Sequence, residues 1–282
     1  MPELPEVETI RRGLAKFIVK DKLKKTTILC GKSFLGKPFC GMVLRIRRFG
    51  KALVIDFDND KSLMIHLRMT GQLIYDGNKE RYAAGHPSEN FVEKLPNKQT
   101  RVILEFEKGT LYFNDQRKFG FIKVLETREV EDDAFIKKLA PEPWQMSGDE
   151  FYEKLQRHKN SSIKAVILDQ TIICGLGNIY ADETRFASKI HPETKAGNIS
   201  KDKAGLILKM ADKVMNLSIA SGGSTLKDYV KADGTRGDYL DKFAKVFNKE
   251  GRKCACGAKI VKIKVAGRGT HFCPNCQRRE ND

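Results

Sequence analysis

The spacing of apolar residues predicts a helix at the start of the chain. Apolar side chains recur there at intervals of three and four, the period of one buried helix face: Val7, Ile10, Leu14 and Phe17. Glutamates gather in the turn that would come first, where the helix dipole favours negative charge. Proline is tolerated only at or before such a start, so we expect the helix to begin close to Pro5.

Between about residues 41 and 125 the apolar positions recur with a period of two. Leu44 and Ile46 alternate with arginines, as in a strand with one buried face. Two further apolar runs lie on either side of Lys108 and Gly109, which predicts a hairpin. Several short strands with turn signals between them favour a β-sandwich or a barrel.

The pattern changes to a helical period near Pro141-Glu142-Pro143. We expect helices over four segments: about 149–157, 161–170, 178–188 and 201–219. From about residue 242 we expect a strand, and then two short strands framed by two pairs of cysteines. The chain therefore predicts a β domain, a helical domain and a small C-terminal module.

Composition adds a partner to this picture. The chain holds 52 Lys and Arg against 36 Asp and Glu, and the net charge of +16 favours a polyanion such as nucleic acid. Residues 231–282 carry thirteen Lys and Arg against six Asp and Glu, or +7. No apolar run approaches the ~18–20 residues of a membrane-spanning helix, and acids interrupt the first twenty residues, so we expect no signal peptide and no membrane partner.

Four of the seven cysteines stand close to the C-terminus, in the pairs Cys254-x-Cys256 and Cys273-x2-Cys276. Four thiolates in two close pairs suit tetrahedral zinc in a closed structural site. The first pair has one intervening residue where zinc ribbons usually have two. A ribbon without metal, or a disulfide formed on oxidation, therefore stays open as an alternative. We expect the other three to be ordinary core thiols: Cys30, Cys40 and Cys174.

Three stretches of the sequence carry a family resemblance: MPELPEVETIRRGL at the start, GLGNIY at 175–180 and GRGTHFC at 267–273. All three resemble bacterial formamidopyrimidine-DNA glycosylase, and the likeness runs from residue 2 to about 279. The resemblance implies a bifunctional base-excision repair enzyme. It would remove oxidised purines, such as 8-oxoguanine and formamidopyrimidines, from double-stranded DNA and nick the strand by β,δ-elimination. It implies a monomer that works in the cytoplasm, at the nucleoid.

The resemblance also implies an α+β multidomain fold. An N-terminal helix and a two-layered antiparallel β-sandwich would occupy residues 2–130. A helix-two-turn-helix domain with a lesion-capping loop would occupy 131–230, and a C-terminal β-hairpin zinc ribbon would occupy 242–279.

The chemistry of Pro2 can be considered directly. Removal of Met1, expected because a small residue follows it, would leave Pro2 with a free secondary amine. An α-amino group titrates near pH 7.7–8.0, so an unprotonated fraction is available at neutral pH. Attack on the sugar C1′ by a secondary amine gives an iminium directly. Glu3 lies next in the chain, placed to move protons. Helix capping alone would explain these residues too, and the resemblance favours catalysis.

The resemblance assigns roles to further residues. Glu6, one turn after Glu3, would contact the lesion or its sugar. Lys51 would grip the phosphate near the lesion and assist β-elimination. Arg268, in a Gly-Arg-Gly turn, would clamp phosphates and is tied to δ-elimination.

A flipped nucleotide leaves a hole in the duplex that the protein must fill. By resemblance, Met69, Arg117 and Phe119 would fill it, with the methionine and the phenylalanine as wedges between base steps. From the residues alone, Met69 and Phe119 would more often be core residues at strand ends. Asn178 lies at the turn of the predicted helix-two-turn-helix, where backbone amides and a short amide side chain can bind phosphate. His66 and Lys159 are weaker phosphate candidates carried over by position.

Three further candidate residues lie either in a loop that would move or in a stretch that differs from the family. Thr225 and Tyr229 belong to the loop that would close over the flipped purine. Arg101 stands where the family has a histidine, because Lys98-Gln99-Thr100-Arg101 replaces its Lys-His-x-His.

Two alternatives stay open. The stretch Val246-Phe247-Asn248-Lys249 leans toward endonuclease VIII, the sister family that acts on oxidised pyrimidines by the same mechanism. A catalytically silent protein that binds lesions or abasic sites is the other.

Overall fold

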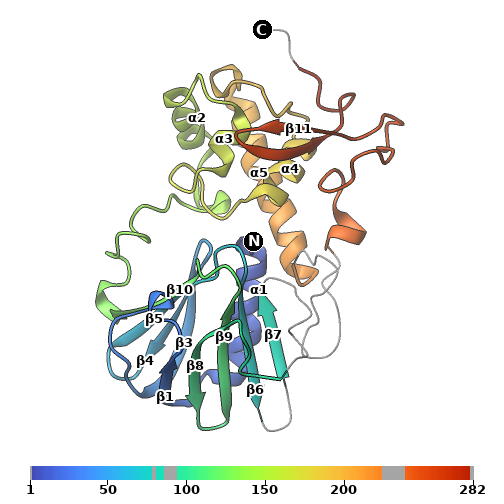
Figure 1. Cartoon of the computed structure of the whole chain (residues 1–282). Coiled ribbons are helices and arrows are strands. Elements are labelled where there is room, and N and C mark those ends of the chain that lie inside the picture. The colour runs from blue at the N-terminus through green and yellow to red at the C-terminus, as the bar shows by residue number, and fades with distance from the viewer. Residues whose placement is uncertain (1, 78–80, 86–93, 224–238, 280–282) are drawn as a thin grey trace. The chain divides into compact units, whose positions relative to one another are not determined.

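The first helix, α1 (Leu4–Ile18), starts at the predicted place in this computed structural model (Figure 1). Glu3 is its N-cap, and Glu3 and Glu6 form a capping box. The buried face matches the predicted stripe except at one position. Ile18 is fully buried, whereas Phe17 is half-buried and stacks on Tyr75 and Tyr82.

The structure describes residues 2–77, 81–85, 94–223 and 239–279, which fall into two units. Unit 1 comprises Met1–Lys137 and Ser221–Asp238, and unit 2 comprises Lys138–Ala220 and Tyr239–Asp282. Besides α1, unit 1 holds these strands: β1 (Lys22–Ile28), β2 (Phe34–Leu35), β3 (Gly41–Phe49), β4 (Ala52–Phe57), β5 (Lys61–His66), β6 (Gly71–Gly77), β7 (Arg81–Gly85), β8 (Thr100–Phe106), β9 (Gly109–Asp115) and β10 (Phe121–Glu126). The predicted hairpin at Lys108 and Gly109 is confirmed as β8–β9.

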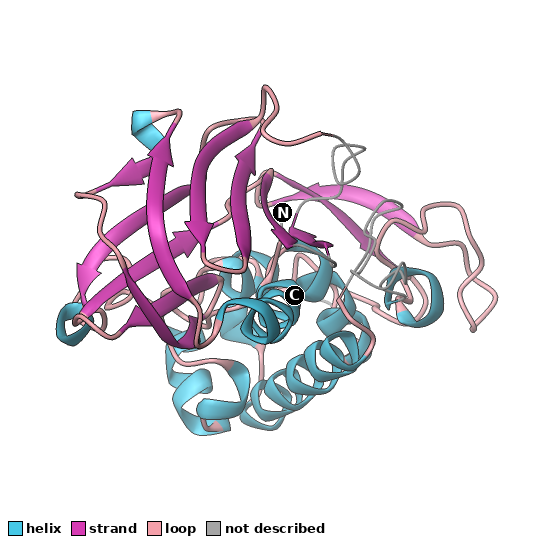
Figure 2. Cartoon of the chain, turned by 90° about the horizontal axis from the view of Figure 1, so that it is seen from below, coloured by secondary structure: helices cyan, strands magenta, loops and turns pink. Residues whose placement is uncertain are grey.

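These strands form one sheet in the order β2-β10-β5-β4-β3-β1-β8-β9-β6-β7. Figure 2 shows the curvature of the strands, which are coloured magenta. β1 joins the two halves, and its ladder with β3 is only two residue pairs long. The halves share one core, in which Ile55 and Leu63 from one half meet Leu73 and Leu104 from the other. The two-layered sandwich is therefore confirmed. Its ladders in the described residues are antiparallel except β2–β10, which is parallel.

Helix α1 closes this core, because it contacts β3 and β4 in one half and β7 in the other. Its buried residues contribute Leu14 and Ile18 to the shared cluster. The N-terminal residues are thus fixed to a rigid platform by burial of apolar surface.

Unit 2 is helical and ends in a hairpin: α2 (Gly148–Arg157), α3 (Ile163–Leu168), α4 (Asn178–Ala187), α5 (Lys201–Ala220), β11 (Val261–Val265) and β12 (Arg268–Phe272). Ser147 and Ser162 cap α2 and α3 by accepting backbone N–H bonds. The four predicted helices are confirmed, and so is the C-terminal hairpin. Among the described helices, none has the length and apolar character to cross a membrane.

The strand predicted from about residue 242 is wrong. Tyr239–Phe243 forms a short π-helix instead. The N–H groups of Lys245, Val246 and Phe247 then donate to the carboxylate of Glu183 at 2.8–2.9 Å. A side chain thus takes the backbone donors that a strand ladder would need.

Candidate functional site

Pro2 and Glu3 are both buried at the start of α1, and Glu3 is only 2% exposed. The backbone N–H of Glu3 donates to Glu6 Oε2 at 2.8 Å. Gly223, also in unit 1, comes so close that an added Cβ would lie 3.4 Å from Glu6 Oε1. The predicted nucleophile, proton shuttle and lesion contact therefore occupy one ordered helix start.

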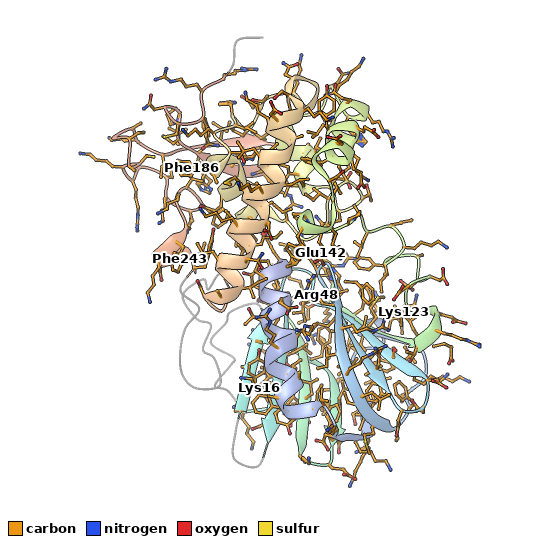
Figure 3. All side chains as sticks on the ribbon, turned by 180° about the vertical axis from the view of Figure 1, so that it is seen from behind. Lys16, Arg48, Lys123, Glu142, Phe186 and Phe243 are labelled. Atoms are coloured by element: carbon orange, nitrogen blue, oxygen red, sulfur yellow. The ribbon has the colours of Figure 1, made fainter. Side chains whose placement is uncertain are left out.

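Lys51 lies in the turn between β3 and β4 and is 8% exposed. A chain of contacts ties this turn to α1, and Figure 3 labels its central residue, Arg48. Arg48 Nε donates to Glu8 Oε2 at 3.1 Å, and the same guanidinium donates to the carbonyl of Gly50 at 3.0 Å. The residue before Lys51 is thus held, through Arg48, by the helix that carries Pro2 and Glu3.

Glu8 is the anchor of this arrangement. Its carboxylate also accepts from Arg11 at 2.8 Å and from Arg12 at 2.7 Å. Burial alone would raise the pKa of Glu8, but the bonds from the arginines outweigh burial and lower it to about 2. Glu8 therefore carries a full negative charge throughout the physiological range.

His66 lies beside Lys51, because Ala52 and His66 face each other across the β4–β5 ladder. Its Nδ1 accepts the backbone N–H of Arg68 at 3.0 Å, and its ring stacks on Phe121. Burial, together with the charges of Arg68 and Lys51, lowers the pKa of His66 to about 3. A phosphate contact by His66 would therefore be a hydrogen bond from a neutral ring.

The three predicted wedge residues occupy two loops at this same end of the sheet. Phe119 is 56% exposed, and the Arg117 guanidinium lies 4.8 Å from its ring centroid. Met69 is half-buried in the turn between β5 and β6. The core interpretation is therefore wrong for Phe119, which presents a large apolar surface to solvent.

Arg101 and Lys159 differ in their freedom to contact a ligand. Arg101 Nε donates to the carbonyl of Asp115 at 2.7 Å and its Nη1 to that of Lys98 at 3.1 Å, so the side chain holds its own loop. Lys159 is exposed in the turn after α2. Thr225 and Tyr229 lie outside the described residues.

In unit 2, Arg268 is exposed at the start of β12. Ala266 and Gly267 join β11 to β12 with φ angles of 50° and 72°. Two consecutive positive φ values are typical of a type I′ turn, in which any residue other than glycine has a strained backbone. The hairpin tip thus carries Arg268 on a tight, defined turn.

Two side chains from the helices hold the residue after Arg268. Asn178, the first residue of α4, donates to the carbonyl of Gly269 at 3.0 Å, and Lys164 donates to it at 3.2 Å. Lys164 is fully buried and also donates to Asp182 at 2.8 Å. Burial lowers the pKa of Lys164 to about 8, against the attraction of Asp182. Asn178 is therefore committed to the hairpin through its side-chain donor.

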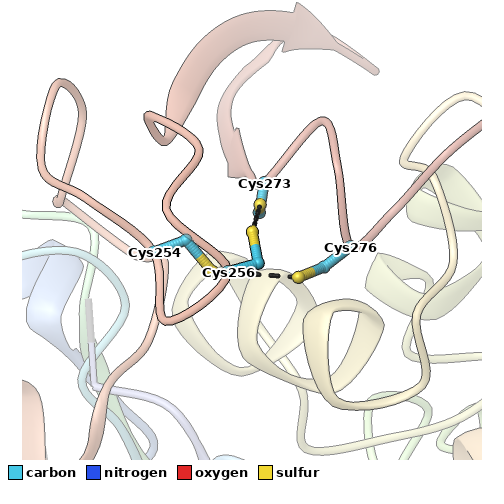
Figure 4. A group of neighbouring side chains, drawn as sticks. All are labelled: Cys254, Cys256, Cys273 and Cys276. Carbon is cyan, nitrogen blue, oxygen red and sulfur yellow. Dashed lines mark hydrogen bonds between the residues drawn. The ribbon is translucent and has the colours of Figure 1, made fainter.

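The four C-terminal cysteines converge (Figure 4). Their sulfurs all lie within 4.8 Å of one another, and two pairs are 3.8 Å and 3.5 Å apart. Tetrahedral zinc with bonds of about 2.3 Å places its sulfurs about 3.8 Å apart, whereas a disulfide needs about 2.05 Å. The four cysteines thus fit a structural zinc site, and the single-residue spacing of the first pair does not prevent convergence. Of the others, Cys174 is buried as expected, but Cys40 is exposed.

The residues that hold the site together were not predicted from the sequence. Glu8 lies four positions after buried Leu4, so its place on the apolar face was a usable signal. Asp115 and Asp182 each have one partner in a distant segment, Thr70 and His271, and these contacts could not be predicted from local sequence.

Comparisons with known proteins agree with this geometry. Family models match three segments: the formamidopyrimidine-DNA glycosylase N-terminal domain over residues 1–122, its H2TH domain over 139–230, and the zinc finger found in FPG and IleRS over 253–279. A formamidopyrimidine-DNA glycosylase of Ligilactobacillus salivarius is 38% identical over 98% of this chain and 99% of its own. The one from Streptococcus thermophilus strain LMG 18311 is 37% identical over 99% and 100%.

Solved structures of the Lactococcus lactis enzyme are similar as well. A complex of a variant of that enzyme with DNA containing Fapy-dG has a TM-score of 0.87 and 34% identity, and covers 99% of this chain and 100% of its own. A complex with DNA containing an abasic site matches with the same TM-score, identity and coverage. With this similarity along nearly its whole length, the chain belongs to the formamidopyrimidine-DNA glycosylase family of DNA repair enzymes.

Proposed function

We propose that this chain excises oxidised purines from double-stranded DNA through a Schiff base on Pro2 and then cuts the strand by β,δ-elimination. One observation carries the proposal: Pro2 and Glu3 lie buried on α1, which is bonded through Glu8 and Arg48 to the turn of Lys51. The wedge loops emerge at that same end of the sheet, since β5 ends and β10 begins there.

In the proposed reaction, the lone pair of the Pro2 nitrogen attacks C1′ of the damaged nucleotide. The bond from C1′ to the base breaks, and its electrons leave with the base, which takes up a proton. The Pro2 nitrogen gives up its own proton. Opening of the sugar ring then breaks the C1′–O4′ bond, protonates O4′ and leaves a C1′=N iminium. Glu3 is our candidate for moving these protons, because it is buried beside the nucleophile.

The iminium makes the C2′ protons acidic, which allows elimination. Loss of one C2′ proton expels the phosphate on C3′ and leaves a C2′=C3′ double bond conjugated with the iminium. Loss of the C4′ proton then expels the phosphate on C5′ in a second elimination. We assign Lys51 and Arg268 to hold these phosphates, supported by their positive charge and their places on defined turns. The net charge of +16 supports a DNA partner, and a DNA substrate supports location at the nucleoid.

We also propose that three parts divide this work: the catalytic domain in 2–130, the helix-two-turn-helix domain in 131–230 and the zinc ribbon in 242–279. The ranges of the three family models support that division.

Oxidised pyrimidines are the second candidate substrate. A Lactococcus lactis relative, 33% identical, has been solved with DNA that contains an oxidised pyrimidine. The stretch Phe247-Asn248-Lys249 before the ribbon points the same way.

Borohydride trapping tests the proposal and separates the candidates. The protein with Met1 removed is mixed with a duplex carrying 8-oxoguanine opposite cytosine, a duplex carrying thymine glycol, or a duplex with an abasic site. Reduction of the iminium should give a covalent protein–DNA adduct on the first and third, mapped to Pro2 by peptide mass. Pro2→Gly, which has a primary amine, should trap much less.

Each other result points elsewhere. An adduct on thymine glycol but not on 8-oxoguanine would identify a pyrimidine enzyme. No adduct on any of the three duplexes, with binding retained, would identify a silent lesion-binding protein. An adduct on a lysine in the unaltered protein would reject Pro2 as the nucleophile.

A further inference from the structure

A buried carboxylate joins the two loops that carry the wedge residues. Asp115 is the last residue of β9 and is fully buried. Its Oδ1 accepts the hydroxyl of Thr70, in the loop of Met69, and the backbone N–H of Arg117 at 3.1 Å. Its Oδ2 accepts the N–H of Gly120 at 2.7 Å, so the carboxylate spans both ends of the second loop.

The backbone of Asp115 reaches a third loop. Its N–H donates to the carbonyl of Gln99 at 2.9 Å, and its carbonyl accepts Arg101 Nε at 2.7 Å. The hydroxyl of Thr70 also accepts the N–H of Arg117 at 3.1 Å, so the first two loops contact each other directly as well.

Each wedge loop contains a residue in a conformation that an L-residue adopts reluctantly. Arg68, next to Met69, has a φ of 51°, and Lys118, between Arg117 and Phe119, has a φ of 57°. Such conformations persist only when surrounding contacts fix them. Hydrogen bonds to the Asp115 carboxylate hold both loops.

We propose that Asp115 is a positioning residue that sets the register of Met69 against Arg117 and Phe119, so that the wedge enters a duplex as one piece. Being fully buried, Asp115 does not itself touch DNA. The inference rests on the proposed function, since it assigns these loops to opening the base stack.

The test compares Asp115→Asn with Asp21→Asn. Asp21 is a matched control: it is also a buried aspartate of unit 1, 1% exposed, and it accepts the backbone N–H groups of Lys22 and Lys108. Lys108 precedes β9 at the end opposite Asp115. Thr70→Val removes the bond from the Thr70 hydroxyl to Asp115 and the bond to it from the N–H of Arg117, but keeps the carboxylate and its other backbone donors. It serves as a second variant if Asp115→Asn folds poorly.

Three measurements are made on each protein: release of 8-oxoguanine from a duplex, fluorescence of 2-aminopurine placed beside the lesion, and borohydride trapping on a single-stranded abasic oligonucleotide. The first two need the base stack to open and the third does not. In Asp115→Asn an amide nitrogen faces backbone donors, which leaves buried groups unpaired. We expect base release to fall about 10- to 100-fold and the fluorescence rise to shrink, while trapping on the single strand stays near that of the unaltered protein.

Asp21→Asn should leave all three readouts near their starting values, and Thr70→Val should lie between the two. Equal losses in Asp21→Asn, or an equal loss of single-strand trapping in Asp115→Asn, would mean that Asp115 merely stabilises the unit and would overturn the inference. If the unaltered protein opens the base stack and forms the trapped adduct, and Asp115→Asn does both equally well, the positioning role alone is overturned. If the unaltered protein neither opens the base stack nor forms the trapped adduct, the proposed function and the inference are overturned together.

Discussion

Glu8 shows how one side chain can link a catalytic terminus to a loop far along the sequence. Its carboxylate is nearly buried, and it binds three guanidinium groups, of which Arg48 is forty residues away. The amphipathic pattern of α1 was sufficient to predict the helix, but not this contact. The hydrophobic pattern shows which face of the helix is buried, whereas the partner of Glu8 depends on the register of β3 and β4 against the helix. The contact between Asp115 and Thr70, forty-five residues apart, escaped prediction for the same reason.

The lowered pKa of Glu8 gives a pH prediction. The folded-state pKa of about 2 lies below the ordinary value of 4.5, so the folded protein holds the charged form more tightly. The resulting stability, on the order of 3 kcal/mol, is fully present above about pH 4.5 and is lost as the pH falls toward 2.

We therefore expect Glu8→Gln to speed hydrogen exchange in peptides from residues 4–18 at pH 7, relative to the unaltered protein at the same pH. The difference in exchange rate between the two proteins should be smaller at pH 3, where the unaltered protein has lost more of the stability that the charge of Glu8 provides. A difference of equal size at both pH values would show that packing, and not charge, accounts for the effect.

Helix α4 holds two other segments of the chain through its acidic side chains. Its neighbouring acids serve two segments: Asp182 accepts the N–H of His271 in β12 at 2.8 Å, and Glu183 accepts three N–H groups from residues 245–247. Burial raises the pKa of Glu183, against the effect of those bonds. The hairpin and the chain leading to it are thus attached to one helix.

Asp182→Asn should loosen this attachment. It would leave the fully buried Lys164 and Arg185 without their anion, a change that typically costs about 3–5 kcal/mol. We expect faster hydrogen exchange in β11 and β12 and faster loss of zinc to a chelator. Asp169→Asn is the control, because Asp169 is exposed and its carboxylate accepts the backbone N–H and the hydroxyl of its neighbour Thr171. Unchanged zinc loss in Asp182→Asn would contradict the role given to α4.

Element types were predictable where local chemistry decides them. The capping box of Glu3 and Glu6, the serine caps of α2 and α3, and the turn at Lys108 are all local signals, and those elements formed. The strand near residue 242 failed because Glu183, sixty residues earlier, takes its backbone donors. The candidate nucleophile and the candidate zinc ligands could be named from motifs, but not the buried acids close to them.

For the molecule as a whole, the charge of +16 should govern affinity for DNA. Each phosphate contact releases counterion, so the logarithm of the binding constant falls with the logarithm of salt by about 0.9 per contact.

Binding to a duplex with a non-cleavable abasic analogue, followed by fluorescence anisotropy between low and moderate salt, measures this slope. Arg268→Ala should reduce the slope by about 1, whereas Arg268→Lys keeps the charge and should keep the slope. An equal slope in all three proteins would remove Arg268 from the phosphate contacts.

The chain passes between its two units three times, after residues 137, 220 and 238. Because unit 1 consists of two separate stretches of the chain, a single recombination event between the genes of two relatives cannot exchange the whole unit. A crossover at residue 137 would join Glu6 from one parent to position 223 from the other. There φ is +90° and an added Cβ would lie 3.4 Å from the Glu6 carboxylate. Because of this φ, the backbone of hybrids made at that junction should be strained at position 223 unless the second parent also supplies glycine there.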